Sequence, residues 1–163
     1  NNGNVMLSAE TAAKYIKDRS VTVLPAKTIA QGYSSLTMFD ANQSLEENVD
    51  EMKELISNVQ TGEVTYAVRN TEYKGLVINK DEYIGIANGE IVTSNVKRTD
   101  TCKKLVDSLI NDDSEIITVM YGNGVNAKEL EEVMLYIEEK YTELEVEAIE
   151  GNQEIYSYIF AVE

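Results

Sequence analysis

The sequence contains no histidine among its 163 residues. Histidine is the usual general base near neutral pH and a common ligand of transition metals, so its absence excludes a Ser-His-Asp triad and a histidine-liganded zinc site. The single cysteine, Cys102, cannot form a disulfide within the chain or assemble a thiolate metal site. Its helical surroundings predict a thiol packed in the core.

Basic residues are also few: 14 lysines and arginines stand against 29 acidic residues, a net charge of -15. A nucleic-acid or anionic-membrane face needs clustered basic side chains, so we expect no nucleic-acid partner and no membrane binding through charge. No apolar run approaches the roughly 18 residues of a membrane helix, and no signal-like succession opens the chain. We predict a cytoplasmic protein without membrane insertion.

Apolar residues make up 43% of the chain, which is enough for a folded core. The order of the expected elements predicts an α/β (α+β) fold in two parts. Residues 1–60 form an α/β segment, and residues 61–163 form an α+β segment with a β-meander and a C-terminal strand. The chain has no initiator Met and opens on an apparent loop, so we expect a fragment whose N-terminal segment continues upstream in a parent protein.

In the first segment, Asn4 is expected to cap a helix over residues 5–18. Residues 21–26 have the β-branched composition of a buried strand, closed by Pro25, and a helix is expected to begin near Thr28. Ser44 and Glu47 have the spacing of a capping box and predict another helix, with Gly62 as its stop signal.

In the second segment the period of apolar residues changes from 3.6 to 2 at Glu63. Residues 63–69, 76–80 and 83–94 alternate as an antiparallel meander, with Asn88-Gly89 as a hairpin turn. We then expect a helix over 99–111, a strand over 115–122, a helix over 127–142, and strands over 144–151 and 155–163. This order predicts a mixed and antiparallel sheet with helices packed on it.

Two loops are candidate ligand sites. Lys27, Thr28 and Gln31 lie where a strand end meets a helix start, a usual ligand position in open α/β sheets, although Thr28 also suits a plain N-cap. Gly122 and Gly124 could cradle an anion but lack the nucleotide-binding fingerprints, and a turn into a helix capped by Asn126 is favoured.

Tyrosine is the main aromatic residue, with ten against two phenylalanines and no tryptophan. Tyr66, Tyr156 and Tyr158 are expected on strands. Half-buried sheet residues are the default interpretation, but tyrosine also suits protein contact surfaces.

Several stretches, in order, span nearly the whole chain and together resemble one known family. They are NNGNVMLSAETAA, VLPAKTIAQG followed by SSL, SLEEN, GEVTYAVRNT, DEYIGIANGEIV and YSYIFAVE. The chain resembles the C-terminal region of the fatty acid kinase catalytic-subunit family, dihydroxyacetone-kinase-like proteins related in fold to DegV-type lipid carriers. Arg69 is part of this pattern, whereas Ala26, Ala30 and Asn70 depart from it, standing where Thr, Pro and Asp are usual.

The resemblance implies a bacterial parent with an N-terminal kinase domain that holds ATP and Mg, a middle domain, and this C-terminal region. The region would dock a DegV-like fatty-acid carrier, so that the kinase phosphorylates the acyl carboxylate and makes acyl phosphate for phospholipid synthesis. The parent would be a homodimer, and this fragment would be non-catalytic, with no cofactor or metal of its own. The alternative is a lipid or small-molecule binding module of DegV-like fold.

Arg69 shares a predicted strand face with Thr65 and Ala67, where an arginine either pairs with a carboxylate or contacts a partner. We expect it to contribute to partner binding. The residues proposed to contact a partner or ligand are Lys27, Thr28, Gln31, Arg69, Asn70, Tyr156 and Tyr158, and no catalytic, cofactor or metal residue is expected in this chain.

Overall fold

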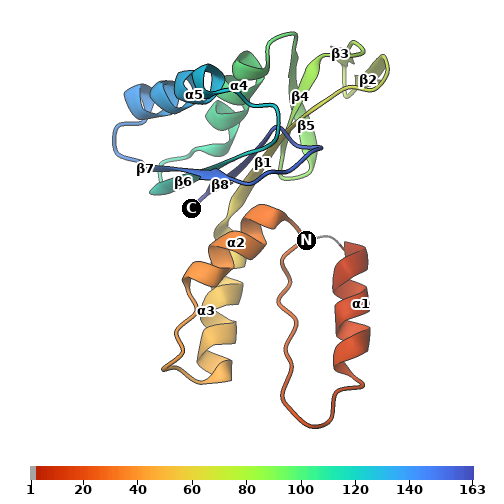
Figure 1. The fold of residues 1–163 in the computed structure, drawn as a ribbon, viewed down its shortest axis with the longest axis vertical. Coiled ribbons are helices and arrows are strands. Elements are labelled where there is room, and N and C mark those ends of the chain that lie inside the picture. The colour runs from red at the N-terminus through yellow and green to blue at the C-terminus, as the bar shows by residue number, and fades with distance from the viewer. Residues whose placement is uncertain (1–2) are drawn as a thin grey trace. The chain divides into compact units, whose positions relative to one another are not determined.

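A computed structural model describes residues 3–163, which form helices α1 to α5 and strands β1 to β8 (Figure 1). The chain divides into two compact units, Asn1–Val59 and Gln60–Glu163. The first unit contains helices α1 (Gly3–Ala13), α2 (Ile29–Thr37) and α3 (Leu45–Asn58). The second contains all eight strands and the remaining two helices.

The capping residues of the first unit explain where its helices begin. Thr28 caps α2 by accepting a hydrogen bond from the backbone N–H of Gln31 at 3.1 Å. Ser44 and Glu47 form the predicted capping box of α3, in which Ser44 N–H donates to the Glu47 carboxylate at 2.8 Å. The helix expected over 5–18 begins earlier and is shorter than predicted, because after Ala13 the chain continues only as turns.

The strand expected over residues 21–26 is not formed. This segment is extended, but it has no strand partner, since residues 3–59 contain only helices and connecting segments. A β-strand is stable only when a neighbour satisfies its backbone groups. The prediction of a strand is therefore wrong for the chain as it stands, although the extended backbone agrees with the composition.

The second unit is built on a six-stranded sheet in the order β5-β4-β1-β8-β6-β7. Its strands are β1 (Gln60–Tyr66), β4 (Tyr83–Ala87), β5 (Glu90–Asn95), β6 (Ile116–Tyr121), β7 (Glu145–Glu150) and β8 (Tyr158–Val162). Only the β6–β7 pair is parallel. The predicted mixed and antiparallel sheet with packed helices is confirmed.

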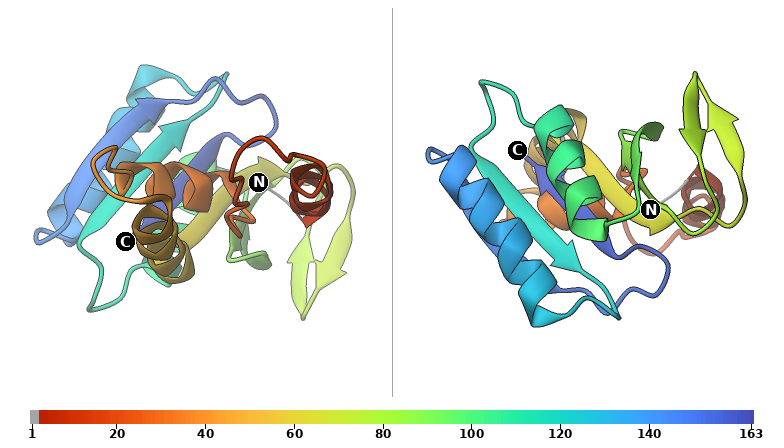
Figure 2. Two further views of the ribbon diagram at one scale, coloured as in Figure 1. Left: turned by 90° about the horizontal axis from the view of Figure 1, so that it is seen from below. Right: turned by 90° about the horizontal axis from the view of Figure 1, so that it is seen from above.

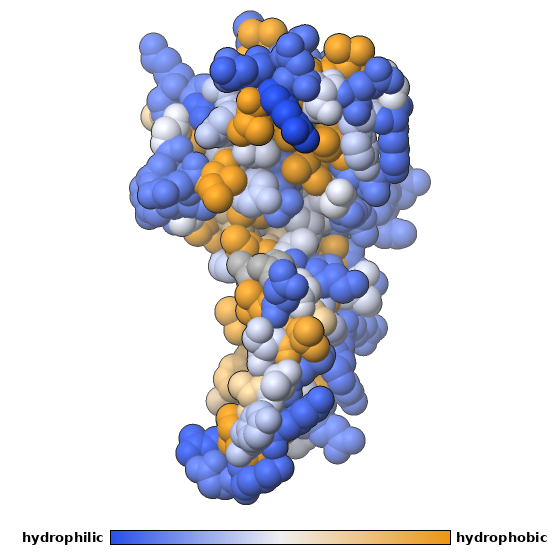
Figure 3. Space-filling model, turned by 90° about the vertical axis from the view of Figure 1, so that its right-hand side faces the viewer, coloured by the Kyte–Doolittle hydropathy of each residue, from blue (hydrophilic) through white to orange (hydrophobic). Residues whose placement is uncertain are grey.

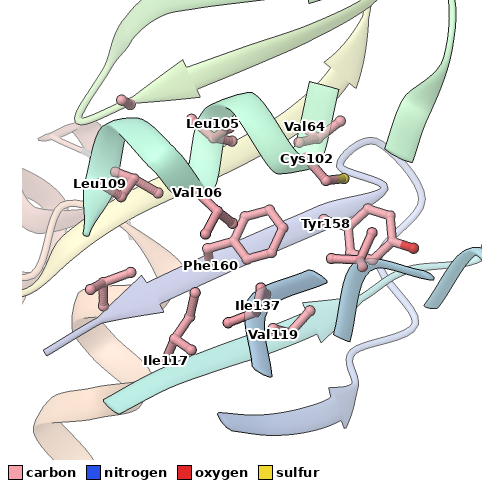
Figure 4. Packing of buried hydrophobic residues seen from close by; sticks show 13 residues of the cluster. Val64, Cys102, Leu105, Val106, Leu109, Ile117, Val119, Ile137, Tyr158 and Phe160 are labelled. Atoms are coloured by element: carbon pink, nitrogen blue, oxygen red, sulfur yellow. The ribbon is translucent and has the colours of Figure 1, made fainter. Parts of the chain in front are cut away.

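Helices α4 (Arg98–Leu109) and α5 (Ala127–Lys140) lie side by side across one face of this sheet (Figure 2). The core forms between them and the sheet, where Leu105 and Val106 of α4 meet Phe160 of β8 (Figure 4). Cys102 is fully buried in the same cluster, as predicted. Burying each large side chain of this kind contributes about 1.5–3 kcal/mol, so this layer fixes the unit.

Two sequence predictions for the meander need correction. Residues 76–80 do not join it, because β2 (Thr71–Tyr73) and β3 (Leu76–Ile78) form a separate two-stranded hairpin. Glu90, at the start of β5, binds both Tyr73 and Lys74 of this hairpin. The predicted Asn88-Gly89 turn is confirmed, with φ of 50° and 88° joining β4 to β5.

Gly62 does not stop a helix, since α3 already ends at Asn58 and Gly62 lies within β1. A Cβ at this position would be 2.5 Å from Leu109 Cδ1. Glycine is therefore required because α4 packs closely on β1. Within residues 3–163, no helix combines the length and apolar composition needed to cross a bilayer.

Candidate functional site

Tyrosines gather at one end of the six-stranded sheet. The last residue of β1, Tyr66, is paired in register with Tyr83, the first of β4. The last residue of β6, Tyr121, is paired with Tyr158, the first of β8. Antiparallel pairing brings the end of one strand beside the start of the next, so these four residues define one end of the sheet, which we call the tyrosine end.

Several apolar side chains around the tyrosine end are exposed. Tyr66 is 52% exposed, and Val68, Val96 and Ile155 are 73%, 78% and 69% exposed. Ile155 is held beside β1, because its carbonyl accepts a hydrogen bond from Thr65 Oγ1 at 2.9 Å. Over the surface of this unit, apolar areas are separated by hydrophilic side chains (Figure 3). Exposed aromatic and aliphatic groups with a polar surround are typical of transient protein interfaces.

A hollow of ≈ 380 Å³ opens at the start of α4, next to the tyrosine end. Its walls include Tyr83, Val96, Lys97 and Arg98, and the carboxylates Glu129 and Glu132 of α5. Lys97 is exposed and has no ion-pair partner among residues 3–163. The hollow therefore offers one free cation beside apolar groups and two carboxylates.

Arg98 forms the floor of this hollow, and its guanidinium is fully engaged. It binds Glu129 at 2.5 Å and the carbonyl of Gly124 at 2.7 Å, and it lies over the Tyr83 ring at 5.5 Å. Burial would lower the pKa of Arg98, but the hydrogen bond and charge of Glu129 outweigh it and raise the pKa. Arg98 thus holds the two helix starts and the loops together rather than offering a free ligand-binding group.

The predicted loop residues of the first unit form a local hydrogen-bond network. Thr28 is the N-cap of α2, and Lys27 N–H donates to Gln31 Oε1 at 2.9 Å. Gln31 Nε2 donates to the carbonyl of Ile56 at 3.1 Å. These groups fix the start of α2 against the end of α3, so the N-cap interpretation of Thr28 is confirmed and a ligand role for the loop is a prediction.

Arg69 and Asn70 lie in the loop that follows β1, not within the strand. The expected face shared by Thr65, Ala67 and Arg69 ends early, because β1 stops at Tyr66. Arg69 is exposed and pairs with no carboxylate among residues 3–163. Asn70 Oδ1 accepts a hydrogen bond from Lys80 N–H at 2.7 Å and closes the loop. Arg69 therefore remains available to a partner near Tyr66.

The two C-terminal tyrosines have different environments. Tyr158 is completely buried, and its ring stacks on Phe160 with centroids 5.8 Å apart. Burial raises the pKa of its hydroxyl. Its predicted role as a surface contact is corrected, since core packing already explains it. Tyr156 is half-buried and precedes β8 instead of lying on a strand, and burial raises its pKa together with the charge of Glu63.

The glycines between β6 and α5 form a structural turn. Gly122 N–H donates to Ser157 O, and Asn123 N–H donates to Gln153 O, both at 2.9 Å. Asn126 and Glu129 form a capping box at the start of α5. These backbone groups are thus used within the fold, which agrees with the favoured interpretation of this loop. Across the described part of the chain, no cluster of three acidic, cysteine or histidine side chains could hold a metal ion.

The fold of this chain is that of DegV proteins. A DegV family protein from Corynebacterium glutamicum matches it with a TM-score of 0.62 at 18% identity, covering 96% of this chain and 67% of that one. A Thermus thermophilus DegV family protein, whose structure is described as showing fatty acid binding, matches with a TM-score of 0.64 at 13% identity. That match covers 99% of this chain and 68% of the other.

Sequence similarity narrows this class to one family. The model of the FakA-like C-terminal family, the C-terminal region of fatty acid kinases of this type, matches residues 1–163, and the chain belongs to this family. An uncharacterized protein of Staphylococcus epidermidis is 42% identical over 163 residues, and protein YloV of Bacillus subtilis is 39% identical. In both comparisons this chain spans 29% of the relative's length.

Proposed function

We propose that this chain is the non-catalytic docking region of a bacterial fatty acid kinase. It binds a separate DegV-like protein that carries the fatty acid, and it presents the acyl carboxylate to the kinase domain of the same parent protein. The parent acts in the cytoplasm as a homodimer and makes acyl phosphate for phospholipid synthesis. ATP and Mg²⁺ are held by the kinase domain, because phosphoryl transfer needs positioned phosphate and metal ligands.

The observation that carries this proposal is the exposed group at the tyrosine end. Tyr66 and Val68 expose most of their apolar surface, and Arg69 beside them has no carboxylate partner in residues 3–163. Tyrosine and arginine are enriched where protein interfaces concentrate their binding energy. A rigid base supports this group, since β1 is paired on both sides by β4 and β8. Membership of the FakA-like C-terminal family supplies the kind of partner.

The direct test is a calorimetric titration of the chain with a DegV-type fatty acid carrier, loaded and empty, at physiological salt. We expect saturable one-to-one binding. Tyr66→Ser and Arg69→Ala should each weaken the affinity about 5-fold or more, as truncation of an interface anchor does. Absence of binding by a correctly folded chain would overturn the proposal.

Matched substitutions separate the tyrosine end from the rest of the surface. Leu135→Ser removes an apolar group that is 48% exposed on α5, and Lys128→Ala removes an exposed cation near the start of the same helix. Both should leave the affinity within about 2-fold, because single surface substitutions outside an interface have small effects. Equal losses in all four variants would place the binding surface elsewhere.

A second candidate function is lipid binding by the chain itself. It is favoured by the fold shared with the Thermus thermophilus protein, whose structure is described as showing fatty acid binding. Mass spectrometry under native conditions would find a co-purified acyl chain if this function holds. A ligand-free mass together with tight carrier binding would favour the docking function.

A further inference from the structure

Helix α1 presents its apolar side chains to solvent. None of its 11 residues is buried, and Val5 and Leu7 are 50% and 64% exposed. Isolated helices shorter than about 12–15 residues are marginal in water, and helices in proteins depend on packing of an apolar face. The composition of α1 therefore calls for a covering surface that residues 3–163 do not supply.

The extended segment that follows α1 has the same deficiency in its backbone. Residues 21–26 make no backbone hydrogen bond within residues 3–163. Val21 and Val23 are β-branched and suit a strand, and Val21 is 43% exposed. Pro25 closes the segment, as proline does at strand ends. Val21–Leu24 is thus a strand without a neighbour, close in sequence to a helix without a covering surface.

We propose that the part of the parent polypeptide preceding this chain completes both features. It supplies a β-strand that pairs in parallel with Val21–Leu24 and a surface that covers the apolar side of α1. A strand before α1, joined through α1 to Val21–Leu24, forms a strand–helix–strand crossover, and such a crossover gives parallel neighbours. The proposal is independent of the docking function.

The comparisons support this choice of partner. The family model describes a C-terminal region, and this chain spans 29% of its relatives, so most of each relative lies outside it. The DegV structures also extend beyond the matched part, since only 67% and 68% of them are covered. A covalently attached strand needs no external partner and loses little entropy on docking.

Hydrogen exchange of the full-length parent and of this 163-residue chain tests the proposal. In the full-length protein, amides of residues 5–13 and 21–24 should exchange at least about 100-fold more slowly than in the chain alone, as paired and covered backbone does. Amides of β1 and β8 serve as an internal control, and their protection should be similar in both proteins. Equally fast exchange of residues 21–24 in both proteins would overturn the proposal.

A substitution on α1 identifies the covering contact. In the full-length protein, Leu7→Ser should restore at least about 10-fold faster exchange over residues 5–13, because it removes an apolar side chain from the covered face. Leu135→Ser is the matched control, since it makes the same change on α5. If the two variants leave α1 equally protected, the apolar side of α1 is not the covered face. The comparison of the unsubstituted proteins stays decisive for the strand even if Leu7→Ser prevents folding.

Discussion

The guanidinium of Arg98, the first residue of α4, binds both oxygens of the carboxylate of Glu129, in the first turn of α5. The arginine side chain is only 12% exposed, and the glutamate side chain is 27% exposed. Glu129 also completes the capping box with Asn126, and Arg98 reaches the carbonyl of Gly124. One ion pair thus connects the starts of both helices to the loop beside the tyrosine end.

Arg98→Ala should lower the free energy of unfolding of the second unit by about 2–4 kcal/mol, because it leaves a shielded carboxylate and a carbonyl without their donor. Arg98→Lys should cost about 1–2 kcal/mol, since lysine keeps the charge but not the forked geometry. Urea unfolding followed by circular dichroism measures both. Lys104→Ala is the control, because Lys104 is exposed and bonds only Asn95. An Arg98→Ala protein as stable as this control would refute the role.

Gly62→Ala should destabilise the second unit by about 1–3 kcal/mol, as overpacking of a filled core does. The added Cβ would stand 2.5 Å from Leu109 Cδ1 and 3.2 Å from Leu105 Cδ2 and Phe160 Cδ2, so α4 must shift away from β1. Gly3→Ala is the matched control, because a Cβ there meets nothing within 4 Å. Thermal unfolding measures both variants, and equal melting temperatures would show that α4 yields without cost.

Local signals in the sequence predicted much of this fold. The capping box of Ser44 and Glu47 and the Asn88-Gly89 turn depend on contacts within a few residues, and both are present. Gly62 was misassigned because its reason, the approach of Leu109, is distant in sequence. Residues 21–26 were misassigned because strand formation depends on a partner as well as on composition.

The candidate site was less predictable, since it depends on strand register. Tyr66 and Tyr83 become neighbours only through the pairing of β1 with β4. The importance of Arg98 was missed altogether, because its partner Glu129 lies 31 residues further on. The signal available in the sequence was a basic residue at a helix start in an acidic chain, which is too weak by itself to indicate a buried ion pair.

Cys102 should be inert to thiol reagents in the folded protein. Its side chain is fully buried, and desolvation raises the pKa of the thiol above its usual value, so little reactive thiolate is present. With Ellman's reagent we expect labelling at least about 100-fold slower without denaturant than in about 6 M guanidinium, because labelling requires opening of the core. Rapid labelling under native conditions would mean that α4 opens locally.

A second cluster joins the same two helices at their other ends. The carboxylate of Asp107 accepts hydrogen bonds from Tyr136 at 2.8 Å and Tyr141 at 2.7 Å, and Lys140 approaches it at 2.7 Å. Burial alone would raise the pKa of Asp107, but the bonds from Lys140, Tyr141 and Tyr136 outweigh it and lower the pKa. Burial and the bond to Asp107 raise the pKa of Tyr141 to about 12.

Asp107→Asn should therefore lower the free energy of unfolding by about 1 kcal/mol at pH 7, because the ionised carboxylate accepts stronger hydrogen bonds than an amide. Since the folded pKa of Asp107 lies below its unfolded value, near 3.8, this advantage is present above that value and is lost as pH falls through the folded pKa. Urea unfolding from pH 7 to pH 3 should show the gap between wild type and variant narrowing below about pH 4. Asp112→Asn, the same change in an exposed turn, should open no gap larger than about 0.5 kcal/mol at pH 7. A gap of constant size over the whole range would mean that the shape of Asp107, and not its charge, holds the cluster together.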